Sequence, residues 1–262
     1  MIFFRINKYL KYTLLSRHKK GHGIHSPFVF DLISRLFRNK IDPGIVFKIE
    51  KIRKRMLSDH RSIVVNDLGA GSERMKTNLR RVSDIAKYSP VPEKYGALLA
   101  NMAAEFGEPM IVELGTSLGI STMYMASSCR GAVVYTIEGS QTISGIASEN
   151  FREAGLENIK IINGSFRENI PAIFNDKNNA GLVFVDGDHR KEPLLDYFNT
   201  IAEVSCNKTV IIIDDIYYSK EMEEAWNEIK RNKKVSVTVD IYRMGIVFFR
   251  EGISHMDYVI RY

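Results

Sequence analysis

The chain has 262 residues, 45% of them hydrophobic and 26% charged, which is typical of a globular protein with one large core and an additional segment. No stretch approaches the roughly 18 uninterrupted apolar residues of a membrane span. The N-terminal apolar residues are interrupted by Arg5 and Lys8, unlike those of a secretory signal, so we expect a cytoplasmic protein. The only two cysteines, Cys129 and Cys206, indicate neither a zinc site nor a disulfide framework.

The net charge of +6 conceals two chemically different parts. Residues 1–90 carry 20 Lys and Arg against 7 Asp and Glu, whereas residues 91–262 carry 17 against 24. We therefore expect two domains, a basic and mainly helical cap or lid at 1–90 and the main domain at 91–262. The basic excess would attract polyanions, although a solvated or acid-paired surface is the simpler interpretation, and we do not expect nucleic acid as a partner.

The first predicted element is an amphipathic helix in IFFRINKYLKYTLL, residues 2–15. Phe3, Ile6, Leu10 and Leu14 lie near one face at helical spacing, with the basic residues largely off it. Such a face packs on an apolar surface, which the rest of the protein, a second subunit in a homodimer, or an anionic membrane can provide. We expect packing within the protein or in a dimer and leave membrane contact open.

A first glycine-containing segment comes next at VVNDLGAGSE, residues 64–73. It has an apolar run, an acid and two glycines. The stretch behind it is basic and polar, and we expect neither a second strand nor an acid at a strand end there. The segment therefore lacks the strand–loop–helix–strand unit in which such glycines hold a nucleotide-like cofactor.

From residue 110 onward, short β-branched runs alternate with stretches of helical length. The first five runs are MIVEL (110–114), AVVYTIE (132–138), IKIIN (159–163), GLVFVD (181–186) and TVIIID (209–214). This alternation predicts a parallel sheet covered on both faces. KVSVTVD (234–240) and GIVFFR (245–250) are joined by a short turn and predict an antiparallel edge pair. The expected fold is α/β, a Rossmann-like, doubly wound, seven-stranded and mainly parallel sheet with an N-terminal helical cap.

Acidic residues or glycines stand at the end of each of the first five strands. Ligands of open parallel sheets bind beyond these carboxyl ends. IVELGTSLGIS, residues 111–121, is followed by a helix and by a strand that ends in Glu138, 25 residues after Glu113. The glycines let the backbone approach a ligand, and the acid can accept hydrogen bonds from ribose hydroxyls. A tight strand-to-helix turn without a ligand is the alternative interpretation.

The acid inside this loop separates two cofactor classes. A dinucleotide usually needs three glycines and places its pyrophosphate at the helix N-terminus, where Glu113 would repel it. The same carboxylate suits the ammonium group of a methionine moiety. The sequence therefore favours S-adenosylmethionine over NAD.

Together these motifs resemble the class I S-adenosylmethionine-dependent methyltransferases, specifically the catechol O-methyltransferase-like family and its relatives with a VDGDH motif. The resemblance rests on YGALL, ELGTSLGIS, IEGS, NGSFRENIP, FVDGDH and IIIDDI, in this order, and covers roughly residues 88–250. It implies that Glu138 binds ribose and that the segment 164–166 lies near adenine. The implied cofactor-binding residues are Glu113, Gly115, Thr116, Ser117, Gly119, Ser121, Glu138, Gly139, Gly164, Ser165, Phe166 and Asp186.

The resemblance also implies a divalent-metal site at Asp186, Asp214 and Asp215, although the family usually has asparagine at the place of Asp215. Oxygen ligands of this kind suit Mg²⁺ or Ca²⁺, which would acidify an acceptor hydroxyl. His189 stands where catechol-type enzymes carry a lysine base, and an imidazole can accept that proton. Asp186 and His189 are the expected catalytic residues. Carboxylates that merely cap the next helix are the alternative.

The expected function is methyl transfer from S-adenosylmethionine to a small-molecule acceptor, with a hydroxyl oxygen favoured. Two alternatives stay open, a cofactor-binding or regulatory protein without turnover and a methyltransferase of a polyanion such as RNA. The acids and His189 favour an enzyme, and the absence of an [DNS]-P-P-[YF] stretch disfavours base methylation. By the same resemblance, the segments before the first sheet strand are a candidate lid, with a surface turn in the helical cap as the alternative: Asp67 to Ser72, Arg80, Arg81 and Tyr88 to Tyr95.

Overall fold

A computed structural model describes residues 2–16, 24, 26–66, 77–174 and 179–262. The chain divides into two compact units, one formed by Met1–Asn39 with Val183–Tyr262 and the other by Lys40–Leu182. The boundary at residue 90 is not one of these divisions. The division into compact units does not bear on whether residues 1–90 serve as a cap. The assignment of a cap at 1–90 and a main domain at 91–262 therefore stays a prediction.

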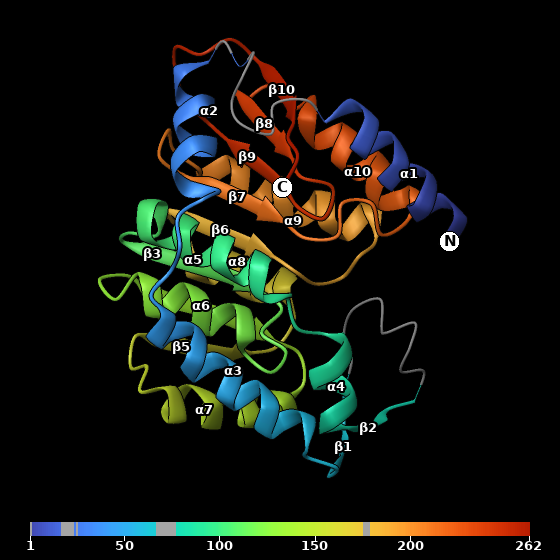
Figure 1. The fold of residues 1–262 in the computed structure, drawn as a ribbon, viewed down its shortest axis with the longest axis vertical. Coiled ribbons are helices and arrows are strands. Elements are labelled where there is room, and N and C mark those ends of the chain that lie inside the picture. The colour runs from blue at the N-terminus through green and yellow to red at the C-terminus, as the bar shows by residue number, and fades with distance from the viewer. Residues whose placement is uncertain (1, 17–23, 25, 67–76, 175–178) are drawn as a thin grey trace. The chain divides into compact units, whose positions relative to one another are not determined.

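In the unit Lys40–Leu182, parallel strands alternate with helices (Figure 1). Strands β3 (Met110–Leu114), β4 (Val133–Glu138) and β5 (Ile159–Asn163) pair in parallel in the order β3-β4-β5. All residues of β3 are buried, as in a strand covered on both faces. The helices are α5 (Glu93–Phe106), α6 (Ile120–Ser128), α7 (Gln141–Ala154) and α8 (Phe166–Ile173). The α/β alternation predicted for this part of the chain is confirmed.

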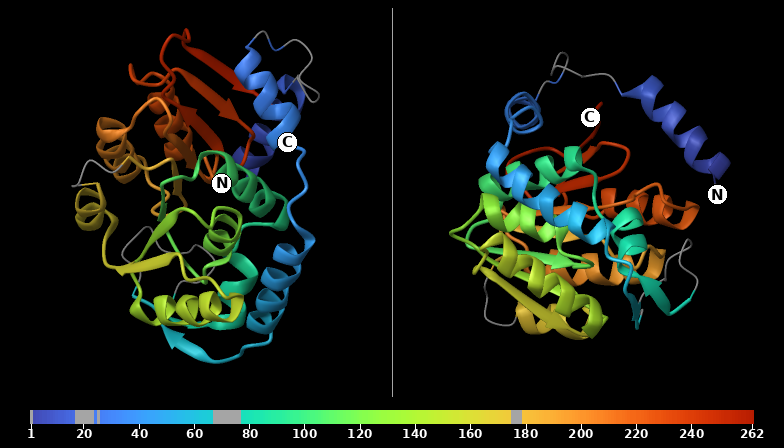
Figure 2. Two further views of the ribbon diagram at one scale, coloured as in Figure 1. Left: turned by 90° about the vertical axis from the view of Figure 1, so that its left-hand side faces the viewer. Right: turned by 60° about the horizontal axis from the view of Figure 1, so that its bottom comes forward.

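The segment before α5 combines helices with a small separate sheet. It contains α3 (Pro43–Leu57), β1 (Ser62–Val64), β2 (Leu79–Arg81) and α4 (Val82–Tyr88). Helix α3 lies beside α7 (Figure 2), where the Arg55 guanidinium donates to the Asn150 amide oxygen at 2.5 Å. Strands β1 and β2 pair antiparallel, so a second strand does come after VVNDLGAGSE, contrary to our expectation. We missed it because the sequence LRR lacks the β-branched and aromatic residues that indicate a strand.

The predicted lid falls on several of these elements. Asp67 to Ser72 lie outside the described residues, Arg80 and Arg81 belong to β2, and Tyr88 to Tyr95 run from the end of α4 into α5. The lid role stays a prediction.

The unit Met1–Asn39 with Val183–Tyr262 holds the remaining strands in the order β10-β8-β9-β7-β6. These are β6 (Leu182–Val185), β7 (Val210–Ile213), β8 (Val237–Asp240), β9 (Gly245–Phe248) and β10 (Met256–Val259). Strand β9 is antiparallel to both β7 and β8, which confirms the expected pair. The pair is not at the edge, because β10 joins β8 in parallel and makes one strand more than the seven expected. Its sequence MDYV is partly exposed and has no apolar run, so periodicity did not reveal it.

The helices of this unit surround a large aromatic core. They are α1 (Ile2–Leu15), α2 (Pro27–Asp31), η1 (Leu32–Leu36), α9 (Lys191–Val204) and α10 (Lys220–Lys230). Trp226, Phe198 and Phe248 are fully buried. Of the two free cysteines, Cys129 in the other unit is buried and Cys206 is half-buried. No described helix combines the length and apolarity needed to cross a membrane.

Helix α1 packs through the face opposite to the one expected. The Tyr12 hydroxyl is buried and donates to the Ile260 carbonyl oxygen at 2.7 Å, and Lys8 forms an ion pair with Glu223 of α10. The predicted apolar face is exposed instead, with Phe3 88% and Leu14 81% accessible. The expectation that this face packs within the protein was therefore wrong for the described residues, because aromatic and charged side chains supply the contact.

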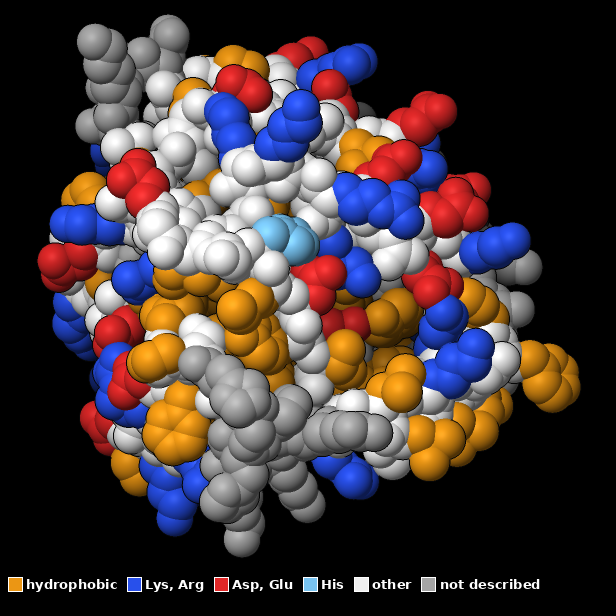
Figure 3. Space-filling view, turned by 90° about the horizontal axis from the view of Figure 1, so that it is seen from above, with side chains coloured by type: hydrophobic (Ala, Val, Ile, Leu, Met, Phe, Trp, Pro, Cys, Tyr) orange, Lys and Arg blue, Asp and Glu red, His pale blue; other side chains and the backbone are white. Residues whose placement is uncertain are grey.

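Some of the basic side chains of the N-terminal part form ion pairs with acids. Besides Lys8 with Glu223, Arg55 Nη2 lies 3.0 Å from Glu153 Oε2, and Arg61 Nη2 lies 2.6 Å from Asp59 Oδ2. On the face shown in Figure 3, Lys and Arg side chains are interspersed with Asp and Glu rather than gathered in one field. These pairs account for part of the basic excess, and the solvated or acid-paired interpretation of the rest stays a prediction.

The packing of α1 gives a first prediction. Tyr12→Ala removes a buried aromatic ring and its hydroxyl contacts, and we expect it to lower the free energy of unfolding by about 3 kcal/mol. Leu14→Ala, on the exposed face of the same helix, should change that free energy by no more than about 0.5 kcal/mol. Urea unfolding of both variants measures the difference. Equal effects of the two substitutions would contradict the packing of α1 described here.

Candidate functional site

The loop between β3 and α6 has a backbone conformation that favours glycine. Gly115 has φ of +106° and Gly119 of +83°, with Ser117 at +47° between them. A Cβ atom on Gly119 would lie 2.3 Å from the Phe151 ring, so packing as well as φ excludes a side chain there. The Gly119 N–H donates to the Thr116 carbonyl oxygen at 2.9 Å and closes the loop. The segment thus forms a tight turn between β3 and α6, and its role in binding a cofactor stays a prediction.

Glu138, at the end of β4, is tied to that loop. Its Oε2 accepts from the Ser117 N–H at 2.9 Å, and its Oε1 accepts from the Ser140 N–H at 3.0 Å. Both donors are backbone N–H groups, so their positions do not depend on the rotamers of Ser117 and Ser140. The contacts fix the direction of the half-buried carboxylate beside Gly139 and beside the glycine loop.

The predicted adenine segment adjoins the same strand end. β4 and β5 pair so that Glu138 stands opposite Asn163, and the Gly164 N–H donates to the Glu138 carbonyl oxygen at 3.1 Å. Ser165 then caps α8, accepting from the Glu168 N–H at 3.3 Å, and Phe166 begins that helix. The structure therefore brings the residues predicted for ribose and adenine together within one unit.

Glu113 lies in a buried network of hydroxyl groups. Its carboxylate is fully buried and accepts from Ser121 at 2.5 Å, from Thr136 at 2.6 Å and from Thr122. Because Thr136 donates its only hydroxyl proton to Glu113, the 2.6 Å contact between Thr116 and Thr136 has Thr116 as its donor. These hydrogen bonds connect β3, β4 and α6 behind the glycine loop.

This network gives the two predicted cofactor residues Glu113 and Ser121 a structural role. Burial raises the pKa of Glu113 to about 7, against the opposing effect of the three hydroxyl donors. Contact of either side chain with a cofactor stays a prediction. Thr122 and Thr136 were not identified from the sequence. The available signals were that Thr122 ends the stretch ELGTSLGIST and that Thr136 stands opposite Glu113 on β4.

The carboxylates of Asp186, Asp214 and Asp215, here called the acidic cluster, belong to the other unit. Asp214 comes directly after β7, and its N–H donates to the Val185 carbonyl oxygen of β6 at 2.9 Å. The Asp214 side chain is fully buried, and burial together with Asp186 and Asp215 raises its pKa. The strand ends thus bring these carboxylates into electrostatic contact, as the sequence predicted.

Asp214 already has a cationic partner. The Arg243 Nε lies 3.0 Å from Asp214 Oδ1, and Nη2 lies 2.7 Å from Oδ2, a bidentate pair. The negative cluster raises the pKa of the Arg243 guanidinium, although burial acts against this. Sequence reasoning missed Arg243, whose only signal is a lone arginine in the turn IYRM between β8 and β9.

Asp215 has a backbone reason for its residue type. Its φ is +51°, in the left-handed region that asparagine and aspartate adopt more readily than most residues. Its carbonyl oxygen accepts from the Tyr218 N–H at 2.8 Å, which closes the turn after β7. An aspartate or asparagine here is therefore explained without a metal ion.

The predicted catalytic pair is close but not hydrogen-bonded. His189 Nε2 lies 3.9 Å from Asp186 Oδ1, beyond hydrogen-bond distance, and both side chains are partly accessible. The His189 ring stacks on Tyr218 with centroids 5.2 Å apart, and the Arg5 guanidinium lies 4.4 Å from the Tyr218 centroid. Helix α1 therefore contributes to the immediate surroundings of His189.

The acidic cluster does not fit a divalent metal. Among the described residues, no group of three or more His, Cys, Asp and Glu side chains is arranged to hold a metal ion. In addition, both oxygens of Asp214 accept from Arg243, which already places a positive charge beside this carboxylate. The metal site that the resemblance implied is not supported by these contacts.

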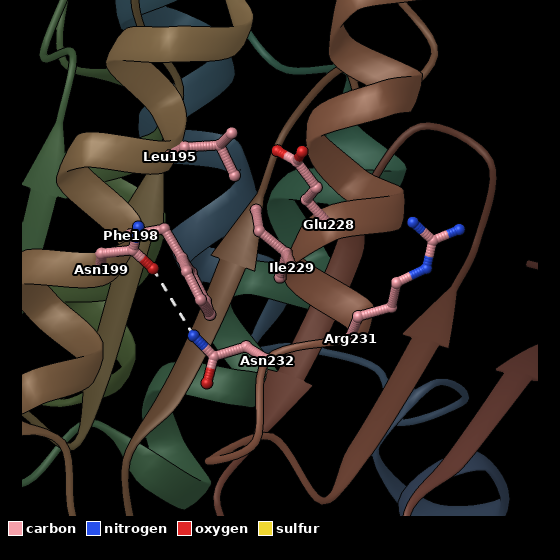
Figure 4. A pocket seen from close by; sticks show the side chains of 7 residues that line it. All are labelled: Leu195, Phe198, Asn199, Glu228, Ile229, Arg231 and Asn232. Carbon is pink, nitrogen blue, oxygen red and sulfur yellow. Dashed lines mark hydrogen bonds between the residues drawn. The ribbon is translucent and has the colours of Figure 1, made fainter.

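A pocket of about 240 Å³ opens elsewhere, along α9 and α10 (Figure 4). The Asn232 amide donates to the Asn199 oxygen across it at 3.5 Å. None of the predicted site residues lines it, so we do not assign it to the site. Its lining residues are Leu195, Phe198, Asn199, Glu228, Ile229, Arg231 and Asn232.

Glycine substitution tests the loop. Gly119→Ala places a Cβ atom against Phe151 at positive φ, and we expect it to lower the free energy of unfolding by more than about 1 kcal/mol. Gly145→Ala, inside α7 where a Cβ would meet nothing within 4 Å, should instead raise it by about 0.5–1 kcal/mol. Urea denaturation reports both. Tolerance of alanine at Gly119 would contradict the described turn.

The buried carboxylate predicts a pH dependence. Because the pKa of Glu113 is about 7 in the folded chain against an ordinary 4.5, the folded state holds a proton that the unfolded state releases between these values. Its contribution to stability should therefore fall by on the order of 3 kcal/mol as pH rises from 4.5 to 8. The free energies of unfolding of Glu113→Gln and of the unaltered chain, each measured at pH 5 and pH 8, isolate this effect. If the free energies of unfolding of the two proteins differed by the same amount at pH 5 and at pH 8, the raised pKa of Glu113 would be refuted.

Comparisons with known proteins place similar sequences among methyltransferases. Residues 112–216 match the family described as "Methyltransferase domain". Over 116 residues the chain is 31% identical to a protein of Mycolicibacterium smegmatis described as a "Putative O-methyltransferase", covering 43% of this chain and 54% of that protein. The chain thus spans about half the length of the curated relatives it matches.

Solved structures show the same fold over most of the chain. A Podospora anserina methyltransferase bound to SAH has a TM-score of 0.60 at 13% identity, covering 86% of this chain and 97% of its own. An O-methyltransferase from Bacillus cereus in complex with SAH has a TM-score of 0.55 at 20% identity, covering 84% and 97%. The expected resemblance is confirmed: the chain has the class I methyltransferase fold, and residues 112–216 are similar in sequence to a methyltransferase domain.

Proposed function

We propose that the chain is an S-adenosylmethionine-dependent methyltransferase that acts on a hydroxyl oxygen of a small molecule. The observation that carries this proposal is Glu138, held by two backbone N–H groups beside a glycine loop. The sequence match over residues 112–216 and the O-methyltransferase names of its relatives support the same activity. The bound SAH in the neighbouring structures supports the cofactor class.

The residues of the unit Lys40–Leu182 fit such a cofactor. The positive φ values of Gly115 and Gly119 let the backbone approach a ligand closely. Glu138 would receive the ribose hydroxyls, and the turn from Gly164 to Phe166 would lie near adenine. When bound, the cofactor supplies an electrophilic methyl group, and the protein has to orient the acceptor and remove its proton.

His189 is the proposed base for that proton. Its imidazole is partly accessible and is oriented by stacking on Tyr218. Asp186, 3.9 Å away, would stabilise the imidazolium that forms. Neither step requires a divalent cation, and the pairing of Asp214 with Arg243 gives no support to the Mg²⁺ or Ca²⁺ that the resemblance implies.

The exposed row Phe3, Ile6, Leu10 and Leu14 on α1 supports contact with a further apolar surface. It would serve a second copy of the chain in a homodimer or a membrane surface. A non-catalytic cofactor-binding protein and a methyltransferase of RNA are the competing functions. For the latter, part of the basic charge of residues 1–90 is paired with acids, as for Lys8 and Arg55.

Calorimetry tests the cofactor assignment. S-adenosylhomocysteine should bind with micromolar affinity, whereas NAD should not bind. Glu138→Ala should weaken binding by at least about tenfold, since a hydrogen bond to a charged group contributes about 1.5–3 kcal/mol. Glu157→Ala, which removes an exposed carboxylate ahead of β5, serves as the control and should bind as the unaltered chain does. Binding of NAD without binding of S-adenosylhomocysteine would overturn the proposal.

A further inference from the structure

We propose that the guanidinium group of Arg243 takes the place of a divalent cation at the acidic cluster, and that Arg243 is a positioning residue in a metal-independent site. The assignment of Arg243 as the resident cation concerns the folded chain alone. Its consequence for methyl transfer rests on the function proposed above.

The first support is the occupation of the carboxylate. Asp214 is fully buried, and its two oxygens accept from Nε and Nη2 of Arg243 at 3.0 and 2.7 Å. A divalent ion would need at least one of these oxygens at roughly 2.0–2.6 Å, depending on the metal. The divalent ion and the guanidinium would then be two positive charges bound to the same carboxylate, and they would repel each other. Ligation of a divalent ion by Asp214 is therefore disfavoured while Arg243 stays paired with it.

The second support is that Arg243 is built into its position. The turn Ile241–Met244 is closed by a 3.0 Å hydrogen bond from the Ile241 N–H to the Met244 carbonyl oxygen. Tyr242 in this turn has φ of +70° and its N–H donates to Asp240 Oδ1 at 2.8 Å. The Arg243 carbonyl oxygen accepts from the Ile216 N–H at 3.2 Å, which links the turn to the segment after Asp215. The backbone therefore holds the guanidinium where Asp214 is.

The third support is charge. Arginine keeps its proton at all physiological pH values, and its planar fork matches a carboxylate. Asp186 and Asp215 also attract this guanidinium. One fixed cation thus reduces the repulsion among three nearby carboxylates, which was the task expected of a metal ion. Asp186, left to interact with His189, then keeps its part in orienting the proposed base.

Manganese binding tests the assignment. Electron paramagnetic resonance should detect no specific Mn²⁺ binding by the unaltered chain at concentrations up to about 1 mM, above the range of dedicated carboxylate sensor sites. Arg243→Gln leaves Asp214, a member of the cluster, without its cationic partner. This variant should bind Mn²⁺ at least tenfold more tightly than the unaltered chain, and its melting temperature should rise when Mn²⁺ is added. Arg190→Gln is the matched control, because it unpairs Asp188 from an arginine 2.5 Å away without altering the cluster. It should gain neither effect.

Two further variants keep the test decisive. Mn²⁺ binding by the unaltered chain that Asp214→Asn abolishes would overturn the proposal. If Arg243→Gln alone does not fold, the double variant Arg243→Gln/Asp214→Asn, which removes both charges, should fold and bind no Mn²⁺. An unfolded double variant would show that Arg243 has a role other than charge compensation. Failure of S-adenosylhomocysteine to bind would remove the proposed function but leave the assignment of Arg243 intact.

Discussion

Burial of carboxylates at the ends of strands is the constraint on which both units depend. A carboxylate loses several kcal/mol of hydration free energy when it leaves water, so the protein must replace that hydration with its own groups. Three hydroxyls do so in part for Glu113, and an arginine does so in part for Asp214, although burial still raises the pKa of both carboxyl groups. Glu138, half-buried, is held by two backbone N–H groups. Each solution also fixes the loop at the end of its strand.

These fixed loops fit the proposed role of the chain in positioning a methyl acceptor. The contacts of Glu138 hold the glycine loop and the predicted ribose site in one geometry before any ligand binds, which lowers the entropic cost of binding. On the other unit, the Arg243 turn and the stacking of His189 on Tyr218 set the surroundings of the proposed base. In-line transfer of a methyl group depends mainly on such positioning of the acceptor.

The features that could be predicted from the sequence are those that depend on periodicity and on strand ends. Alternating apolar runs located β3 to β9, and the acids and glycines after them located the candidate site residues of each unit. The missed features depend on contacts between distant residues. Arg243 is an ordinary turn residue until folding places it on Asp214, and the buried face of α1 depends on Tyr12 reaching Ile260. Strand β10 escaped because an exposed edge strand needs no apolar pattern.

The most direct measurement is anomalous X-ray diffraction at the manganese edge from crystals soaked in Mn²⁺. The central claim is that the protein's own groups compensate its strand-end carboxylates. The account predicts no anomalous peak among Asp186, Asp214 and Asp215, with the Arg243 guanidinium still paired to Asp214. An anomalous peak within ligand distance of Asp214, with Arg243 displaced, would contradict it.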